Sequence, residues 1–224
     1  PAPRMREYVQ ALRAIWDCWT NGTPLDYQGE HYQVRLMTPN FTPEPCEYGT
    51  PKVQIAAVGP VMMKVAAEEC DGVMLHAFCT GKYLREVILP RLNKGLENSG
   101  RRREDFEISG GGFVVTGADD EAVSKMFEWV RMRVGFYGST PSYWPVFEQH
   151  GWEDLGFKLN DLSKKGQWEQ MTNEVSDDIV NEFCAVGRFD QITDKIRRRF
   201  AGSVDAIAMP ENTPSDLLEE IRRI

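Results

Sequence analysis

Long apolar runs, cysteine pairs and basic clusters are all scarce in this chain of 224 residues, and each scarcity excludes a class of protein. No apolar run is long enough to cross a bilayer and no signal peptide is recognisable, so we expect a cytoplasmic protein without a membrane partner. The five cysteines are odd in number, scattered, mostly within apolar runs and without a CxxC pair, which indicates reduced core thiols. The three histidines have no paired acid at ligand spacing, so we expect no catalytic metal.

The charge balance argues against a nucleic-acid partner. The formal net charge is −8, and the densest basic run, Arg101–Arg103, is followed at once by Glu104 and Asp105. That run is typical of a solvated loop. No linker rich in Pro, Gly or Ser divides the chain, so residues 1–224 are predicted to form a single domain.

The stretch from Pro51 to Gly81 is the part around which the rest of the chain is organised. Val53–Ala57 is a short apolar run, typical of a buried parallel strand, and a helix follows at Pro60. Asp71 is most simply the turn residue that ends this helix, and Val73–Ala77 is a second buried strand. Two strands joined by one helix form a βαβ unit with a parallel sheet, in an α/β fold.

The turn between the first strand and its helix is a candidate anion site. Pro60 suits the first helical position, where its missing N–H costs nothing. The amides of Gly59, Val61 and Met62 would then be free at the helix N-terminus, where the helix dipole favours a phosphate group. The alternative is that this turn is only the helix start found in any βα unit.

The carboxyl ends of parallel strands are where α/β folds bind ligands, and this places Val58, Gly59, His76 and Phe78 on the functional rim. His76 either meets a ligand or is a hydrogen-bonded rim residue without a chemical role. His31 and His150 are expected in surface or loop positions.

Outside this unit the pattern predicts further helices and strands in turn. Apolar spacing, glycine turns and helix-start residues indicate helices over 1–19, 82–98 (with Pro90 kinking it or starting it afresh), 119–137, 192–200 and 214–224, a hairpin over 25–34, and strands over 106–116 and 204–209. Residues 139–183 contain short helical pieces rich in aromatic residues. Such a segment is either a lid over a site or an inserted cap, and its aromatic side chains either fill a core or line a substrate pocket.

Four motifs in this order resemble the bacterial luciferase-like monooxygenase superfamily, and most closely its branch that uses the deazaflavin coenzyme F420. They are EYVQALRAIW, YQGEHYQV, PKVQIAAVGPVMMKVAAEECDG and AVGRFDQITDKI. The resemblance implies a TIM (β/α)8 barrel with an inserted segment, here the helical insertion at about 139–183. On that pattern the chain carries strands five to eight and lacks strands one to four, so the catalytic residues are expected upstream of Pro1.

The resemblance also implies site residues. The strand-five turn, formed by Ala57, Val58, Gly59, Pro60, Val61 and Met62, matches the segment that holds the coenzyme's phosphate and polar tail. The end of strand six provides His76, Ala77 and Phe78 as substrate-pocket residues, followed by Cys79. Sugar-phosphate dehydrogenases of the family have a threonine and a lysine there, so we expect a larger, more apolar substrate than a sugar phosphate.

Three functions follow as alternatives. The first is an oxidoreductase that transfers a hydride between a deazaflavin and an unidentified organic substrate. The second is a monooxygenase that uses flavin mononucleotide (FMN). The third is a catalytically incomplete half-barrel with a structural role, which pairs with another copy or with its missing half. Either pairing would cover strand edges that are otherwise exposed, and we expect a homo-oligomer.

Overall fold

The computed structural model describes all residues from Pro1 to Ile224. Contacts along the chain divide it into two units, and each is described by itself. The first unit comprises Pro1–Val73 and Arg91–Phe106, and the second comprises Met74–Pro90 and Glu107–Ile224. The boundary passes through strand β4 (Gly72–Leu75) and near the start of helix α4 (Leu89–Asn98). The single domain expected from the sequence stays a prediction.

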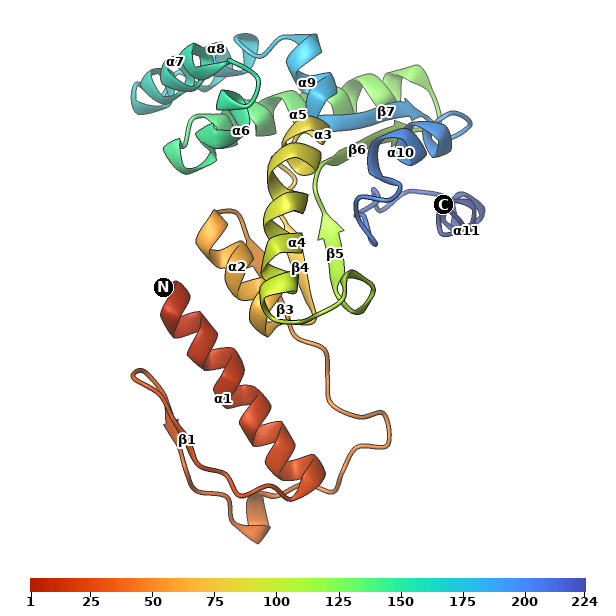
Figure 1. Ribbon diagram of the computed structural model, residues 1–224. Coiled ribbons are helices and arrows are strands. Elements are labelled where there is room, and N and C mark those ends of the chain that lie inside the picture. The colour runs from red at the N-terminus through yellow and green to blue at the C-terminus, as the bar shows by residue number, and fades with distance from the viewer. The chain divides into compact units, whose positions relative to one another are not determined.

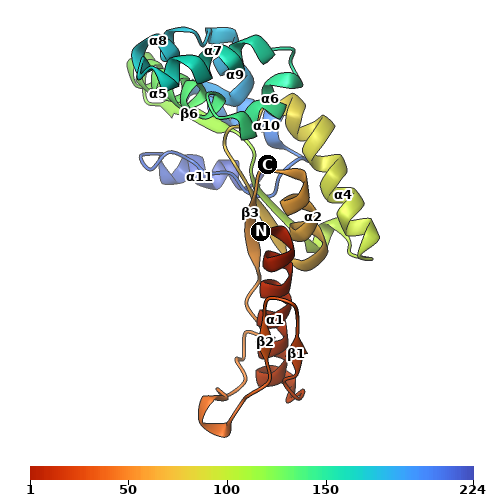
Figure 2. The same ribbon diagram turned by 90° about the vertical axis from the view of Figure 1, so that its left-hand side faces the viewer.

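The first unit begins with a long helix and a small hairpin. Helix α1 (Ala2–Asn21) ends where Gly22 adopts the left-handed conformation, with φ 71°. Strands β1 (Tyr27–Gln28) and β2 (Gln33–Val34) pair antiparallel, with Tyr27 opposite Val34. The hairpin runs alongside α1 in both ribbon views (Figures 1 and 2). The helix and hairpin predicted from the sequence are therefore confirmed. A 3-10 turn, η1 (Pro39–Phe41), lies in the segment that leads to the next strand.

A strand, a helix and a second strand follow in the predicted order. Strand β3 (Gln54–Ala57) leads into α2 (Pro60–Glu69), and β4 is the neighbour of β3. Helix α2 buries Met63, Val65, Ala66 and Ala67. Within this unit the C-terminal part of α4 packs tightly on α2, because a Cβ added at Gly95 would lie 2.6 Å from the Cβ of Ala67.

Ion pairs attach α1 to α2 and to the turn after α2. Arg6 contacts Glu68 and Glu69, and Arg13 donates to a carboxylate oxygen of Asp71 over 2.8 Å. Asp71 is thus more than the turn residue that the sequence indicated. Its other partners are the Val53 amide at 2.7 Å and the guanidinium of Arg101 at 3.5 Å.

The arginine run after α4 differs from the solvated loop that was expected. Arg101 is half-buried and donates hydrogen bonds to the carbonyls of Ala67 and Cys70, so it is a structural residue of the first unit. Only Arg102 matches the expectation, since it is exposed and pairs with Asp105 within the 3-10 turn that includes η3 (Arg103–Asp105). The sequence pattern could not distinguish these two arginines because the partners of Arg101 lie about thirty residues earlier in the chain.

In the second unit the chain after β4 forms a helix of mixed type. The short α3 (Gly81–Tyr83) continues as a π-helical segment, η2 (Leu84–Ile88), and then as α4. The predicted irregularity at Pro90 is this π-helical turn, which ends two residues before the proline. A wider turn at this place is consistent with the missing N–H and the ring of Pro90, which disturb a regular α-helical ladder.

The strand predicted over 106–116 is two strands. β5 (Glu107–Gly110) and β6 (Phe113–Gly117) are separated because Gly110, Gly111 and Gly112 have φ values of 88°, 88° and 153°. β5 is the neighbour of β4, and a Cβ at Gly110 would lie 2.4 Å from the carbonyl oxygen of Leu75. The expected role of these glycines, to allow a close approach of backbone, is therefore confirmed at Gly110.

The sequence analysis missed one strand and predicted another that the structure does not contain. Strand β7 (Cys184–Arg188) was not predicted as a strand, yet it pairs in parallel with all of β6, from Phe113 opposite Cys184 to Gly117 opposite Arg188. The segment 204–209 was predicted as the last strand, but it makes only one isolated bridge, from Ala206 to Ser109. The partners of both segments lie far away in sequence, so local pattern does not report them.

Three helices of the second unit lie next to the β6–β7 pair: α5 (Asp120–Gly138), α9 (Asp177–Phe183) and α10 (Ile192–Phe200) (Figure 1). Helix α5 begins where the Asp119 carboxylate accepts a 2.8 Å hydrogen bond from the Ala122 amide. The insertion predicted at 139–183 is helical, comprising η4 (Pro141–Tyr143), α6 (Trp144–Glu148), α7 (Glu153–Lys164), α8 (Trp168–Asn173) and α9. Helices α10 and α11 (Ser215–Ile221) follow β7 and share a core of Val114, Ala185, Ile192, Ile196, Phe200 and Leu217.

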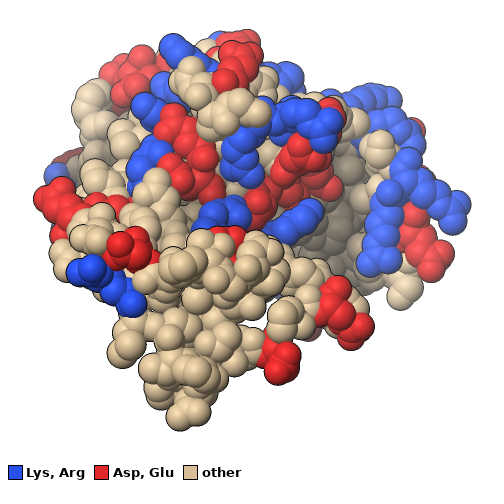
Figure 3. All heavy atoms as spheres, turned by 60° about the horizontal axis from the view of Figure 1, so that its bottom comes forward, with Lys and Arg blue, Asp and Glu red and all other residues tan.

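Charged side chains cover only part of the face that Figure 3 shows. Basic and acidic residues are mixed across its upper part, and a region of other residues lies below them. None of the helices combines the length and the apolar composition that crossing a bilayer requires. All five cysteines are free, and Cys70, Cys79 and Cys184 are buried, but Cys46 is exposed, so the prediction of core thiols was wrong for Cys46.

Candidate functional site

The turn from Ala57 to Met62 lies at the carboxyl end of β3, as the sequence predicted. Ala57 is the last, buried residue of the strand, and Pro60 is the first residue of α2. Gly59 is the N-cap, with φ −85° and ψ 159°, and no side chain caps the helix. The carbonyl of Gly59 accepts the first helical hydrogen bond, from the Met63 amide at 3.1 Å.

This geometry leaves the helix N-terminus open to a ligand. Gly59, Pro60 and Val61 are exposed, and a Cβ built on Gly59 would meet no atom within 4 Å. The amides of Val61 and Met62 belong to the first turn, where a helix has no carbonyl partners to offer. Backbone amides and the helix dipole favour an anion at such a place, but they do not distinguish one anion from another. The residues therefore fit the phosphate-bearing end of a coenzyme.

The end of β4, in the second unit, carries the predicted pocket residues. His76 directly follows the strand and is half-buried, Ala77 is half-buried, and Phe78 is 2% exposed. The ring of His76 contacts Tyr137 at a centroid distance of 4.5 Å and Tyr143 at 5.0 Å. The structure thus joins the end of β4 to α5 and to the start of the helical insertion.

Phe78 lies deeper in the same aromatic cluster. Its ring packs against Phe183 at 4.6 Å, Phe147 at 5.4 Å and Tyr143 at 5.5 Å. Phe147 and Phe183 are fully buried, so these rings form the core of the insertion. Trp168 and Phe157 are more than half exposed. Of the two alternatives for the aromatic residues, a cap core holds for Phe147 and Phe183, whereas Tyr143 contacts His76, as does Tyr137 of α5.

The protonation state of His76 follows from its surroundings. Its Nδ1 accepts a 3.0 Å hydrogen bond from the amide of Phe78, so Nδ1 carries no proton. Burial lowers the pKa of His76, because the charged imidazolium loses hydration. The side chain is therefore a neutral imidazole at pH 7, and its remaining proton sits on Nε2 as a hydrogen-bond donor. Burial also raises the pKa of Tyr143, with a further contribution from Tyr137, so Tyr143 stays protonated.

Polar contacts attach the insertion to the segment after β4. The hydroxyl of Thr80 lies 2.7 Å from Nε2 of His150, whose ring stacks on Trp152 at 4.1 Å. The same hydroxyl oxygen accepts a 3.1 Å hydrogen bond from the Tyr83 amide, so Thr80 connects His150 to the start of α3. Lys82 donates to the carbonyl of Gln149 over 2.7 Å.

Sequence reasoning missed several of these residues. His150 was expected at the surface, but it is half-buried and bonded to Thr80. Tyr137 and Thr80 were not singled out at all. Their partners lie about 60 to 70 residues away in the chain, and the only available signal was that Thr80, like His76, follows the end of a buried strand.

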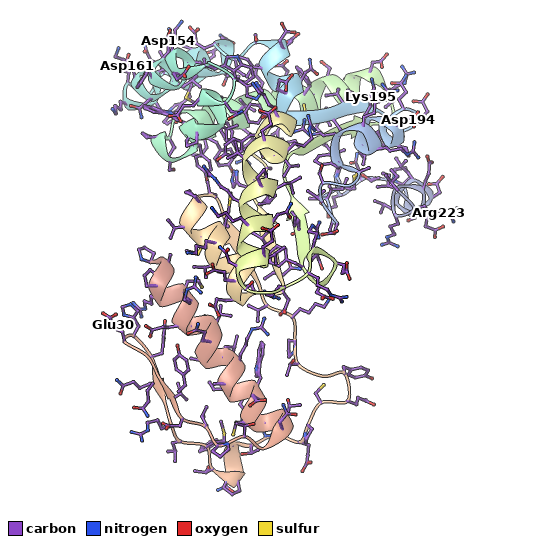
Figure 4. All side chains as sticks on the ribbon, viewed as in Figure 1. Glu30, Asp154, Asp161, Asp194, Lys195 and Arg223 are labelled. Carbon is purple, nitrogen blue, oxygen red and sulfur yellow. The ribbon has the colours of Figure 1, made fainter.

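One group of side chains has the composition of a metal site. Ligand atoms of Glu7, Glu30 and His31 lie within 4.8 Å of one another in the first unit, and Glu30 is at the tip of the hairpin (Figure 4). An oxygen of Glu7 already accepts the amides of His31 at 2.7 Å and Tyr32 at 3.2 Å. Those bonds lower the pKa of Glu7 and give its carboxylate a structural role in closing the hairpin on α1.

The sheet of β3, β4 and β5, the parallel pair of β6 and β7, and the helices that cover them define an α/β protein. The chain belongs to the luciferase-like monooxygenase family, whose model matches residues 1–206. The resemblance inferred from the four sequence motifs is thereby confirmed.

Individual relatives agree with this membership. An uncharacterized protein of Mycobacterium tuberculosis (strain ATCC 25618 / H37Rv) is 47% identical over 92% of this chain and 61% of its own length. The 5,10-methylenetetrahydromethanopterin reductase of Archaeoglobus fulgidus is 26% identical over 100% of this chain and 64% of its own. The chain therefore spans a little over three fifths of the length of these relatives.

A solved structure shows the same fold. The coenzyme F420-dependent tetrahydromethanopterin reductase of Methanopyrus kandleri matches with a TM-score of 0.70 and 20% identity, over 97% of this chain and 60% of that one. The α/β fold predicted from the sequence is confirmed at this level.

Proposed function

We propose that this chain is part of a deazaflavin-dependent oxidoreductase and that it contains the later strands, five to eight, of a TIM barrel. In this proposal the turn Ala57–Met62 binds the phosphate and polar tail of coenzyme F420. His76, Ala77 and Phe78 line the pocket for an organic substrate. The observation that carries the proposal is the uncapped, exposed helix N-terminus at Gly59, in a chain whose relatives include a 5,10-methylenetetrahydromethanopterin reductase.

In this proposal the turn at Gly59 and the residues around His76 have different roles. A bound deazaflavin supplies a ring carbon that gives or accepts a hydride. The amides of Val61 and Met62 hold the anionic end and so fix the position of the coenzyme. The neutral His76 donates its Nε2–H to a polar atom of the substrate, while the rings of Tyr137 and Tyr143 exclude water and restrict the substrate's orientation.

The pocket residues favour an apolar substrate over a phosphorylated one. The ring of His76 contacts the rings of Tyr137 and Tyr143, and no Lys or Arg occurs in the chain from His76 to Gly81. Lys82, the first cation after β4, donates to the Gln149 carbonyl. A substrate with an aromatic or aliphatic body and one acceptor oxygen matches these contacts best.

The turn can be tested with three substitutions at one position. Since a side chain at Gly59 has free space and φ is −85°, Gly59→Asp, Gly59→Asn and Gly59→Ala are all tolerated by the backbone. Asp and Asn are both good N-caps, so both variants are expected to be at least as stable as the original chain. Asp alone adds a negative charge, and we expect it to weaken F420 binding at least tenfold relative to Asn.

The measurement is a titration of the chain with coenzyme F420, followed by quenching of tryptophan fluorescence. Gly59→Ala is the control for the added Cβ and should bind F420 as the original chain does. Equal affinity of the Asp and Asn variants would show that no anion lies at this turn, and the coenzyme assignment would then be lost.

An FMN-dependent monooxygenase is the second candidate, since the family takes its description from monooxygenases. FMN also carries a phosphate, so the turn alone does not separate the two coenzymes. Parallel titrations with F420 and FMN decide between them. Tighter binding of FMN would replace the first proposal by the second.

The third candidate is a half-barrel without catalytic activity that pairs with a second copy of the chain. Sedimentation of the chain over a range of concentrations tests it. A monomer with a cooperative thermal transition would contradict this candidate, and a dimer that binds neither coenzyme would favour it.

A further inference from the structure

A hollow of about 340 Å³ in the second unit is bordered by ten residues, of which four are basic. Arg85 comes from η2, Lys195, Arg198 and Arg199 come from α10, and Glu182 is the one acid among the lining residues. Figure 4 shows Lys195 projecting from α10. In the same measure a cavity needs only about 10–15 Å³ to hold one water molecule, so the hollow is ample for a phosphate group.

These cations lack the carboxylate partners that most other arginines of the chain have. Arg6, Arg13, Arg101, Arg131, Arg188 and Arg197 all form ion pairs with acids. On α10, the acid Asp194 pairs with Arg197 at 2.5 Å and is thereby engaged outside the hollow. No ion pair involves any of the four basic residues that border the hollow. In a chain of net charge −8, four unpaired cations around one hollow are an unusual local surplus.

Arg199 is fixed at the base of this group. Its two Nη atoms donate to the carbonyls of Glu182 at 2.8 Å and Cys79 at 2.9 Å, and its Nε is buried without a partner. A buried N–H of a charged group without an acceptor costs free energy, and an anion in the hollow would offset the positive charge of this guanidinium group.

The backbone is shaped to allow this placement. A Cβ on Gly112, which has φ 153°, would lie 2.8 Å from Nε and Nη2 of Arg199. Arg85 folds back over Gly81, where a Cβ would lie 3.1 Å from its Nη1. At both positions a residue larger than glycine would therefore place its side chain where the guanidinium group of an arginine lies.

The surroundings of Arg199 oppose its positive charge. Burial is the largest influence and lowers the pKa of Arg199. Cys79, Cys184 and Glu182 raise this pKa by smaller amounts, and Arg85 adds the smallest contribution, which lowers it. Arginine stays protonated in proteins, so the site keeps its positive charge at neutral pH. The cost of keeping these charges together falls when a dianion binds.

We infer that the hollow bordered by Arg85, Lys195, Arg198 and Arg199 binds a phosphate group, either as free phosphate or as the phosphate of an ester. This site is distinct from the turn at Gly59, whose donors are backbone amides. The guanidinium groups instead offer charged donors that suit a tetrahedral dianion.

The test is isothermal titration of the chain with inorganic phosphate at constant ionic strength, with chloride as the balancing anion. We expect saturable binding at one site. Arg85→Gln combined with Arg198→Gln should weaken it at least tenfold. Both side chains are exposed, so the double variant should keep its fold, and a thermal melt checks this. Lys125→Gln, which removes an exposed cation of α5 outside the hollow, is the matched control and should leave binding unchanged.

Titration with phenyl phosphate distinguishes a phosphate ester from free phosphate as the ligand of the hollow. Binding at least as tight as that of phosphate assigns the hollow to an ester, and much weaker binding assigns it to the free ion. Unchanged phosphate affinity in the double variant would overturn the inference, and so would citrate binding as tightly as phosphate. Loss of phosphate binding in Gly59→Asp, with retention in the double variant, would place the anion at the turn and would also overturn it.

Discussion

Asp71 shows how one carboxylate can organise a large part of a unit. It accepts hydrogen bonds from the Val53 amide and from Arg13, and it lies within ion-pair distance of Arg101. These partners come from the segment before β3, from α1 and from the chain after α4. Sequence reasoning identified only the local turn, because the arginines are 58 and 30 residues away.

We predict that Asp71→Ala lowers the free energy of unfolding by about 2–3 kcal/mol, since it leaves an amide and two guanidinium groups without their acceptor. Urea denaturation followed by circular dichroism measures the change. Asp26→Ala is the control, because the Asp26–Arg35 pair has side chains that are 56% and 66% exposed. Exposed pairs contribute about 0–1 kcal/mol, so equal losses in the two variants would contradict the structural role of Asp71.

At the scale of helices and strands, the sequence predicted those boundaries that are set by residues close to them in the chain. Helix α1 ends at a left-handed glycine, α2 begins at a proline, and α5 begins at an aspartate cap, and each signal lies within four residues of the boundary it sets. The position of the candidate anion turn followed from the same signals.

What the sequence did not predict depends on distant partners. β7 is a strand because β6 pairs with it from about seventy residues earlier, and the segment around Ala206 is not one because only Ser109 pairs with it. The aromatic surroundings of His76 came from α5 and the insertion for the same reason. Periodicity within a short window contains no information on such pairings.

The close approach of α2 and α4 gives a prediction at this scale. Gly95→Ala would gain about 1 kcal/mol of helix propensity, but its Cβ would lie 2.6 Å from that of Ala67. We expect the overlap to dominate and to lower the free energy of unfolding by about 1–3 kcal/mol.

A double-mutant cycle isolates this contact. Ala67→Gly removes the opposing methyl group, so the double variant should be more stable than the sum of the two single changes implies. Urea denaturation of the four chains gives the coupling energy. If the free-energy changes of the two single variants simply added, the helices would accommodate the Cβ of residue 95 without an energetic cost.

For the whole molecule, the pH dependence of stability reflects two histidines of the second unit. Burial lowers the pKa of both His76 and His150 below the unfolded value of 6.5. Unfolding therefore takes up protons below about pH 6.5. The stabilisation is complete above the unfolded pKa and is lost as the pH falls through the folded pKa of each residue. Carboxylates with lowered pKa values, such as Glu7 and Asp105, add their own losses only in more acidic solution.

We expect the free energy of unfolding of the full chain to fall between pH 7 and pH 5. His150→Gln should reduce this slope, and His76→Gln combined with His150→Gln should nearly remove it. His31→Gln, which changes an exposed histidine, is the control and should leave the slope unchanged. The measurement is urea denaturation at pH 7, 6 and 5, and an undiminished slope in the double variant would assign the proton uptake to other groups.

The parallel pairing of β6 with β7 has a consequence for how such a protein can diversify. The two strands hold the ends of the intervening helical segment side by side, from Phe113 beside Cys184 to Gly117 beside Arg188. For a segment with anchored ends, doubling its length costs only about 0.6 kcal/mol of closure entropy. Helices between these strands can therefore be lengthened, shortened or exchanged during evolution while the framework keeps its register, and new substrate preferences can arise without a new scaffold.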